Sequence, residues 1–152
     1  MRPKQHPGFI SAKPPSRFNP PALAEKLSKA PLDKKVGIRH IILYSGKSWS
    51  YHLAEVRSLV NPHVHFKGDE IYYVIEGSGR MHVGYVAQGQ KNYTAKWEAP
   101  LEVKAGDAFI IPPAYAHSLQ NTGSMPIVII FRCPPGHLSD KDRFAVKSKP
   151  VY

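Results

Sequence analysis

The sequence predicts an all-β fold, an antiparallel β-barrel or jelly roll with one short helix. Short runs of apolar, aromatic and β-branched residues, which are typical of strands, recur at close spacing along the chain. Between them lie turn residues, supplied by 11 glycines and 15 prolines among 152 residues. A sheet of this kind closes on itself and leaves a cavity at its mouth, where side chains from distant strands can meet.

The N-terminal region, residues 1–35, is expected to form a proline-rich basic arm with a short helix. Six prolines fall within residues 1–21. This density prevents a continuous helix or an interior strand there. Asn19 can cap a helix that begins at Pro20, because proline is tolerated in the first helical turn. Pro31 ends that helix, since the residue before a proline disfavours the helical conformation.

The predicted barrel spans residues 36–139, and its first half begins with two long strands. An isoleucine-rich strand at 36–44 is followed by a Ser-Gly-Lys turn and a strand at 49–60. Asn61-Pro62 then bends the chain, and residues 71–75 form an apolar and aromatic strand. His40 and His52, which lie on the two long strands, are interpreted as half-exposed strand residues.

The second half of the predicted barrel contains five shorter strands separated by glycine and proline turns. Gly106 lies in a turn that requires a positive φ, and two prolines follow the strand after it. The last strong strand has the sequence PIVIIFR. The five strands are expected at residues 80–86, 93–98, 101–103, 108–111 and 126–132.

Three histidines and a glutamate form the candidate functional site. His63 and His65 are two residues apart, so a strand presents both imidazoles on one face. A Lys-Gly-Asp turn then resets the alternation, which lets Glu70 point the same way. His117 follows a strand and a Pro-Pro turn further along. Imidazole and carboxylate groups together suit a divalent transition metal. The sequence therefore predicts a metal site at His63, His65, Glu70 and His117.

The two stretches that carry these residues resemble the paired motifs of the cupin family over about residues 36–135. The first motif, His-x-His followed by Glu and Gly, is matched by His63, His65, Glu70 and Gly77. The second motif, Gly-Pro-Gly-His-Asn, is matched by Gly106, Pro112, His117 and Asn121. Ala114 stands where the second motif usually has glycine, and Arg57 stands where a glycine usually precedes the first histidine. The resemblance implies a cupin β-barrel, also called a double-stranded β-helix.

The predicted ligand set leaves open coordination positions on Fe, Mn, Ni or Zn, and an open position can bind substrate, water or dioxygen. Without a cysteine ligand, a structural thiolate zinc site is not expected. The resemblance implies equally broad chemistry, because cupins include dioxygenases, isomerases, epimerases, decarboxylases, lyases and non-catalytic binders. We expect a metal-dependent enzyme acting on a small molecule, with a dioxygenase as the first hypothesis. One alternative is an isomerase, epimerase or lyase. Another is a non-catalytic cupin that binds a metal or a small molecule. A cupin barrel with an empty metal site is the third.

Tyr72 is the candidate catalytic residue. It lies two residues beyond Glu70, so a strand points it into the same cavity, where a phenol can act as a general acid or base. Some cupin lyases carry a tyrosine at the matching place, and the alternative is a tyrosine that only packs in the core. Arg80 and His82 share a strand face and could contact an anionic substrate, although Met81 is a better candidate for the inward face.

The formal net charge of +10 lies mostly outside the predicted barrel. Residues 1–40 carry nine basic against two acidic side chains, residues 41–139 carry eight against seven, and residues 140–152 carry four against two. We interpret the two ends as solvated basic segments, the last one a C-terminal tail, and consider nucleic-acid binding unlikely in the absence of a basic motif interleaved with aromatics.

Other features of the sequence bear on partners and location. A single cysteine excludes an internal disulfide framework, and no apolar run is long enough to cross a bilayer. The expected location is the cytoplasm, without a membrane partner. A homodimer, with strands or the proline-rich arms exchanged across the two-fold, is expected from the resemblance and from the need to cover the edge strands of a small barrel.

Overall fold

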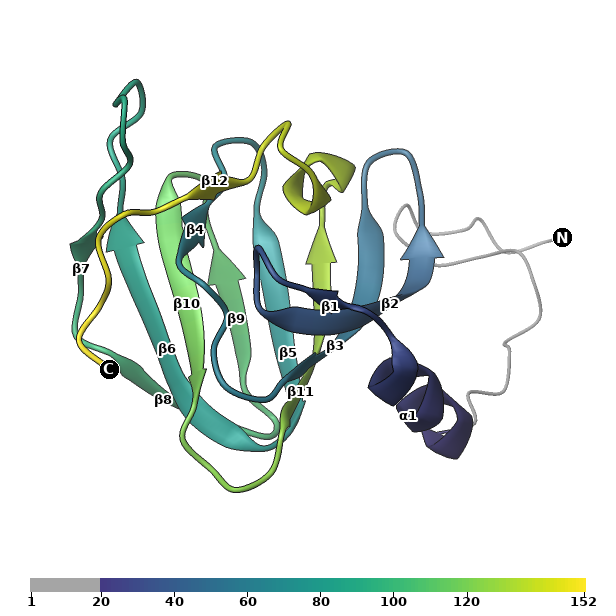
Figure 1. The fold of residues 1–152 in the computed structure, drawn as a ribbon. Coiled ribbons are helices and arrows are strands. Elements are labelled where there is room, and N and C mark those ends of the chain that lie inside the picture. The colour runs from purple at the N-terminus through teal and green to yellow at the C-terminus, as the bar shows by residue number, and fades with distance from the viewer. Residues whose placement is uncertain (1–19) are drawn as a thin grey trace, which may run out of the picture.

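Two antiparallel sheets face each other and curl into a barrel (Figure 1). The computed structural model describes residues 20–152, so most of the predicted N-terminal arm lies outside the described residues. The first sheet has the order β1 (Leu32–Asp33), β2 (Ile38–Ser45), β3 (Ser50–Val56), β11 (Ile127–Cys133), β5 (Glu70–Glu76) and β9 (Ala108–Ile111). The second has β12 (Phe144–Ala145), β4 (His63–Val64), β10 (Tyr115–Asn121), β6 (Ser78–Tyr85) and β7 (Lys96–Trp97), with β8 (Leu101–Lys104) also paired to β6. The predicted antiparallel β-barrel is confirmed.

The core lies between the two sheets, and the alternation of the strands explains which side chains enter it. On β11, Ile127, Ile129 and Phe131 are buried, while the residues between them are only half-buried. Met81 and Leu119 face them from the second sheet. Each such side chain contributes roughly 1.5–3 kcal/mol when it leaves water. Alternate residues of each strand face the core, and the strand register that this fixes also decides which way the site residues point.

The helix α1 (Pro20–Lys29) packs against β2 and β3 at the edge of the first sheet. Its Leu27 is buried, and Arg39 on β2 donates a hydrogen bond of 2.8 Å to the carbonyl of Ala30, just past the helix end. The predicted short helix, beginning at Pro20 and ending before Pro31, is confirmed. No helix in residues 20–152 is long and apolar enough to cross a membrane.

Two residues of the second sequence motif hold loops at opposite ends of β10. Ala114 adopts φ = 68°, a left-handed conformation that glycine adopts at lower cost, and its N–H donates to the carbonyl of His65 at 2.8 Å. At the other end, the Asn121 side-chain amide donates to the carbonyls of Val56, Arg57 and Met125. The alanine therefore occupies the backbone geometry of the glycine that it replaces.

The C-terminal segment, which its charge led us to predict as a tail from residue 140 on, lies along the second sheet. After the 3-10 helix η1 (Pro135–Leu138), β12 pairs with β4. Phe144 packs near Phe66 and Tyr93, with ring centroids 5.7 and 5.4 Å away. Figure 1 shows η1 and β12 together at one end of the barrel, beside β4. Apolar side chains between the charged ones explain this packing.

Candidate metal centre

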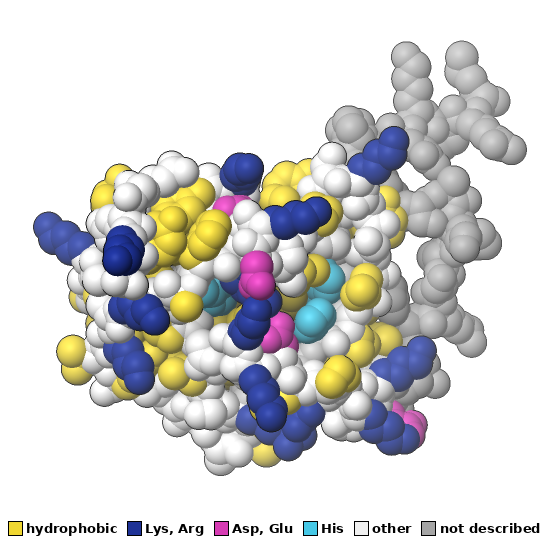
Figure 2. All heavy atoms as spheres, turned by 45° about the horizontal axis from the view of Figure 1, so that its top comes forward, with side chains coloured by type: hydrophobic (Ala, Val, Ile, Leu, Met, Phe, Trp, Pro, Cys, Tyr) yellow, Lys and Arg dark blue, Asp and Glu magenta, His cyan; other side chains and the backbone are white. Residues whose placement is uncertain are grey.

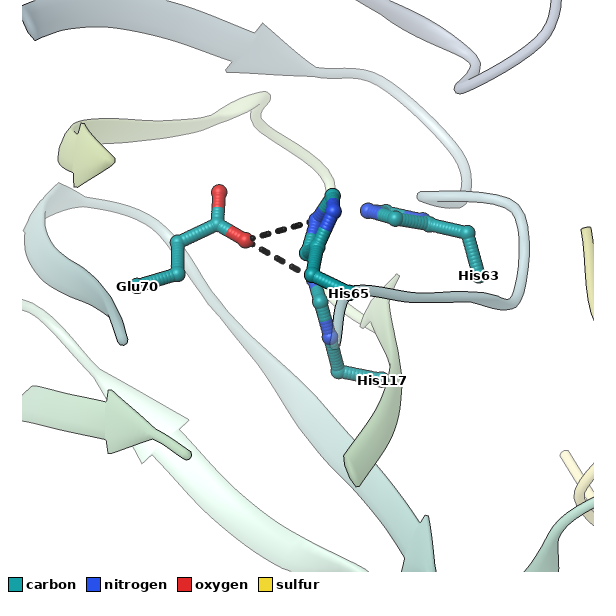
Figure 3. Close-up of side chains that lie close together, drawn as sticks. All are labelled: His63, His65, Glu70 and His117. Atoms are coloured by element: carbon teal, nitrogen blue, oxygen red, sulfur yellow. Dashed lines mark ion pairs between the residues drawn. The ribbon is translucent and has the colours of Figure 1, made fainter. Parts of the chain in front are cut away.

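The four predicted ligands meet at the end of the barrel that η1 and β12 cover. His63 begins β4, His65 follows that strand, Glu70 begins β5, and His117 lies on β10 (Figure 3). His117 pairs directly with His63 across the β4–β10 ladder. The loop between β4 and β5 returns the chain so that Glu70 faces the imidazoles. Three strands and one loop thus bring together groups that are far apart in sequence.

Ligand atoms of the four side chains lie within 4.8 Å of one another, and all four residues are buried. Glu70 Oε2 lies 3.1 Å from His65 Nε2 and 3.2 Å from His117 Nε2 (Figure 3). The His63 ring completes the group, with its centroid 4.3 Å from that of His117. The four side chains therefore enclose one common point.

The three imidazoles are oriented by the backbone. Nδ1 of His63 lies 2.7 Å from the carbonyl of Asn61, Nδ1 of His65 lies 2.5 Å from that of Asp142, and Nδ1 of His117 lies 3.3 Å from that of Tyr115. A carbonyl accepts only, so each Nδ1 carries the proton and donates. In a neutral imidazole with this proton position, Nε2 holds a free lone pair, which is the arrangement found in metal-bound histidines.

The polar atoms that converge on the site lack hydrogen-bond partners. His65 Nε2, His117 Nε2 and Glu70 Oε2 are buried, and none makes a hydrogen bond. Buried polar atoms are nearly always satisfied, and three lone pairs without a proton between them repel one another. A cation at their common point would satisfy all three at once. The donor set of imidazole nitrogen and carboxylate oxygen fits a divalent transition metal.

The protonation states of the ligands suit a metal. Burial, with His117 and His65 beside it, lowers the pKa of His63 well below 6.5, so this imidazole is neutral. Burial opposes the ionisation of Glu70, but the adjacent imidazoles of His117 and His65 favour the carboxylate and hold the pKa of the carboxyl well below its ordinary value. Metal ligands must be deprotonated to bind, and these two groups are deprotonated at neutral pH.

A fourth histidine, which was not predicted, lies against the site. His137 on η1 stacks on His65, with ring centroids 3.8 Å apart and 2° between the planes. Its Nε2 donates to the carbonyl of Lys67 at 2.6 Å, and its buried Nδ1 lies 3.9 Å from Glu70 Oε2 without a hydrogen bond. The Pro-Pro-Gly-His sequence around it has no strand periodicity, so nothing in the pattern placed it at the site.

Asp142 supports the site from the C-terminal segment and was also missed. Its carboxylate accepts the backbone N–H groups of Phe66 and Lys67 at 2.8 and 2.9 Å, and its carbonyl accepts from His65. With His65 and His137 it forms a second group with metal-ligand spacing. Because both carboxylate oxygens already accept backbone N–H groups, we interpret Asp142 as the support of the β4–β5 loop.

Tyr72 lies beside the predicted ligands, as its spacing from Glu70 indicated. The side chain is buried and lines the same cavity, with its ring 5.8 Å from that of His117 at an angle of 86°. Burial and the charge of Glu70 raise the pKa of the phenol well above 10, so it is protonated. Tyr73 is exposed on the opposite face of β5.

Other polar strand residues lie away from the cavity. Arg80 is exposed and pairs with Glu102 at 2.6 Å, and His82 is buried beside Gln120 and Tyr152. Neither lines the cavity, whereas Met81 enters the core. The prediction that His52 is half-exposed is wrong, because it shares its strand face with buried core residues and stacks on Phe131, with centroids 4.7 Å apart.

The cavity at the site, which three of the four ligands line, has a volume of about 20 Å³. Figure 2, which looks onto this end of the barrel, shows histidine side chains near the middle of the face, next to acidic and basic side chains. A space of this size holds about one water molecule. The cavity is lined by Asp33, Val36, Ile38, His40, His63, His65, Glu70, Tyr72, Phe131, His137, Leu138 and Arg143.

Comparisons with known proteins agree with this architecture. An uncharacterized protein of Methanocaldococcus jannaschii is 32% identical over 93 residues, and glucose-6-phosphate isomerase of Thermococcus onnurineus is 34% identical over 100 residues. These matches cover 60% and 63% of this chain, but the chain spans only 64% and 46% of the two relatives.

Solved structures share the fold at lower identity. An uncharacterized protein with a double-stranded β-helix domain from Klebsiella pneumoniae is 19% identical with a TM-score of 0.61, over 88% of this chain and all of that one. Oxalate decarboxylase of Bacillus subtilis is 23% identical with a TM-score of 0.53, over 71% of this chain and 28% of that one. The cupin family profile matches residues 44–134, more than half of the chain. The chain belongs to the cupin family.

Proposed function

We propose that this chain is a metal-dependent cupin enzyme that acts on a small molecule in the barrel cavity. The observation that carries the proposal is the convergence of buried, unpartnered ligand atoms from His65, Glu70 and His117, completed by His63. Fe, Mn, Ni or Zn suits this donor set. When bound, such a metal supplies a Lewis acid with open positions for substrate, water or dioxygen.

The residues of the chain would each have a distinct part in this function. The four ligands hold the metal, and the backbone carbonyls behind the three imidazoles fix their orientation. Tyr72 is the proposed catalytic residue, because its protonated phenol lies in the cavity beside His117 and can donate a hydrogen bond or a proton to substrate. The apolar side chains of Val36, Ile38 and Phe131 limit water in the cavity.

Dioxygenase chemistry is the first reaction proposed, because a mainly imidazole site with open positions suits Fe(II). The alternative is a metal-dependent isomerase, epimerase or lyase that uses Tyr72. The similarity to glucose-6-phosphate isomerase of Thermococcus onnurineus favours the isomerase alternative. A non-catalytic metal-binding cupin is the third candidate, and its cavity would bind ligands without turnover.

Elemental analysis of protein purified without chelator tests the proposal. We expect about one equivalent of metal in the parent and none in the His63→Ala/His117→Ala double variant. His82→Gln is the matched control, since it changes a buried histidine outside the cavity and should keep the metal. An iron-containing parent directs the next assays to oxygen consumption, and zinc, nickel or manganese directs them to isomerase and lyase substrates. No metal in the parent, even after reconstitution, would refute the proposal.

A Tyr72→Phe variant separates catalysis from metal binding. It should keep the metal and the fold but lose turnover once a substrate is identified, because only the hydroxyl is removed. Unchanged turnover would assign Tyr72 to packing alone.

We also propose a homodimer through the outer face of the first sheet. A groove of about 430 Å³ lies between α1 and this sheet, with mainly apolar walls that include Leu23, Ile75 and Val128. Ile75 and Ile110 are 42% and 69% exposed. Contiguous apolar surface of this kind marks an interface, and a second copy presents the same surface about a two-fold axis. Light scattering should give twice the chain mass, and Ile75→Asp should reduce it to the monomer.

A cytoplasmic location remains part of the proposal. It is supported by the one cysteine of the chain, Cys133, which is a buried free thiol. Burial and the charge of Glu70 raise the pKa of this thiol to about 12, so it is unreactive.

A further inference from the structure

Arg143 stands out among the residues that line the cavity at the candidate metal centre. It is the only lysine or arginine among those lining residues, all of which lie in the described part of the chain. Its side chain is 12% exposed, although it belongs to the C-terminal segment that follows η1. A guanidinium so nearly buried is costly unless it is paired.

The partner of Arg143 is a carboxylate from a distant part of the chain that also lines the cavity. Arg143 Nη1 lies 3.1 Å from Asp33 Oδ2, and Asp33 is the last residue of β1. Asp33 is held in place, because its Oδ1 accepts the backbone N–H groups of Lys35 and Val36 at 3.0 and 3.4 Å. The Asp33 carboxylate therefore lies at the cavity as a fixed partner of Arg143.

The pair leaves most of the binding capacity of Arg143 unused. Within residues 20–152, the guanidinium makes one hydrogen bond, through Nη1, whereas its planar fork can bind a carboxylate through two parallel N–H groups. A ligand carboxylate could therefore make a better contact with Arg143 than Asp33 does. Its opposite end would then face His63, His65 and Glu70, which line the same cavity.

The size of the cavity also indicates that Asp33 and Arg143 must separate when a substrate binds. At about 20 Å³ it has no room for an organic substrate in this structure, in which Asp33 and Arg143 are joined. Both residues belong to short segments at the margins of the sheets, β1 and the loop before β12, and no disulfide or long strand ties either of them. Separation of the pair would free the guanidinium, and because both residues line the cavity it would also enlarge the space.

We propose that Arg143 recognises the carboxylate of a small anionic substrate, and that Asp33 occupies its place until the substrate binds. This inference rests on the proposed function, since the other end of the substrate would lie at the metal. The substrate class is a small carboxylic acid with a second oxygen that can reach the metal, such as a hydroxy or oxo acid. Neutral sugars and cationic molecules lack the group that replaces Asp33.

The test compares two probes of nearly the same size, the anion glycolate and its neutral amide, glycolamide. Binding to cobalt-loaded protein is followed by calorimetry and by the visible absorption of the metal, neither of which requires turnover. The parent should bind glycolate at least tenfold more tightly than glycolamide. Arg143→Gln should weaken glycolate binding at least tenfold and leave glycolamide binding unchanged, and Arg143→Lys should fall between.

Asp33→Asn gives the sharpest outcome, because it removes the competitor and should strengthen glycolate binding several-fold. If the ion pair is purely structural, Asp33→Asn and Arg143→Gln should both lower the melting temperature. Neither should then change the preference for glycolate over glycolamide. That result would overturn the inference. Arg80→Gln is the matched control, since it removes an arginine from an exposed ion pair outside the cavity.

Two further outcomes keep this inference separate from the proposed function. Metal content is measured on every variant, so a parent that binds metal but shows no preference for glycolate refutes the role of Arg143 alone. A parent without metal refutes the proposed function instead, and metal-free protein is then titrated with the same probes. Tighter binding of inorganic phosphate than of glycolate would also overturn the choice of a carboxylate.

Discussion

The imidazole rings of His65 and His137 stack face to face, with their centroids 3.8 Å apart and only 2° between their planes. One ring comes from the loop after β4 and the other from η1, so this contact joins two parts of the chain that are distant in sequence. The stack fixes the plane of a proposed metal ligand, and the hydrogen bond from His65 Nδ1 to Asp142 fixes its rotation. Contacts that orient a metal ligand in this way influence metal affinity strongly.

We predict that His137→Ala lowers metal affinity about tenfold to a hundredfold, because the ring of His65 loses its neighbour. His137→Phe should restore most of that affinity, since an aromatic ring can keep the stack. The measurement is a competition titration against a chromogenic chelator. Equal losses in the two variants would show instead that the Nδ1 atom near Glu70 is the important group.

Asp142→Ala should destabilise the fold and weaken metal binding together. The substitution leaves the N–H groups of Phe66 and Lys67 without an acceptor, at a cost of about 1–3 kcal/mol in the free energy of unfolding. Denaturant titration and the same chelator competition measure the two effects. Asp140→Ala is the control, because that exposed carboxylate pairs with Lys35 on the surface and should matter little. Equal effects of the two changes would contradict the role given to Asp142.

Stability should fall with decreasing pH because of His52. Burial, with His40 beside it, lowers the pKa of His52 in the folded state to about 4, below the 6.5 of an unperturbed histidine. The unfolded chain therefore binds the proton first, and stability that is complete above pH 6.5 is lost as the pH falls toward 4.

The slope from this one group is about 1.4 kcal/mol per pH unit at most. Urea titrations of metal-free protein at several pH values measure it. His52→Phe, which cannot be protonated, should give a flatter dependence than the parent between pH 6 and pH 4. An unchanged slope would assign the acid sensitivity to other histidines.

Ala114 offers a test of backbone strain. An alanine at φ = 68° has a conformational free-energy cost of roughly 1 kcal/mol that glycine lacks, although glycine loses more backbone entropy on folding. Ala114→Gly should therefore be neutral or stabilising by up to about 1 kcal/mol, whereas Ala114→Val should be clearly destabilising, because a β-branched residue tolerates this conformation poorly. Thermal unfolding of the parent and the two variants gives the order of their melting temperatures. A glycine variant less stable than the parent would contradict the argument.

Local patterns predicted the barrel and its four candidate ligands because strand alternation fixes which side chains share a face. His63 and His65 obey that rule, and the turn before Glu70 carries its own sequence signal. His137 and Asp142 follow no period, and their positions depend on how η1 and the next loop pack against the β4–β5 loop. His52 was misjudged because alternation does not say which of two faces is the inner one until tertiary packing decides it.

The direct pairing of His63 with His117 across β4 and β10 has a mechanical meaning. A metal bound by both imidazoles would act as a cross-link between the two strands, closing the long loop of chain between them. The two strands could then separate only after a metal–nitrogen bond had broken. Loading would therefore slow unfolding and increase resistance to proteolysis, and it would make the lifetime of the folded barrel depend on the supply of metal.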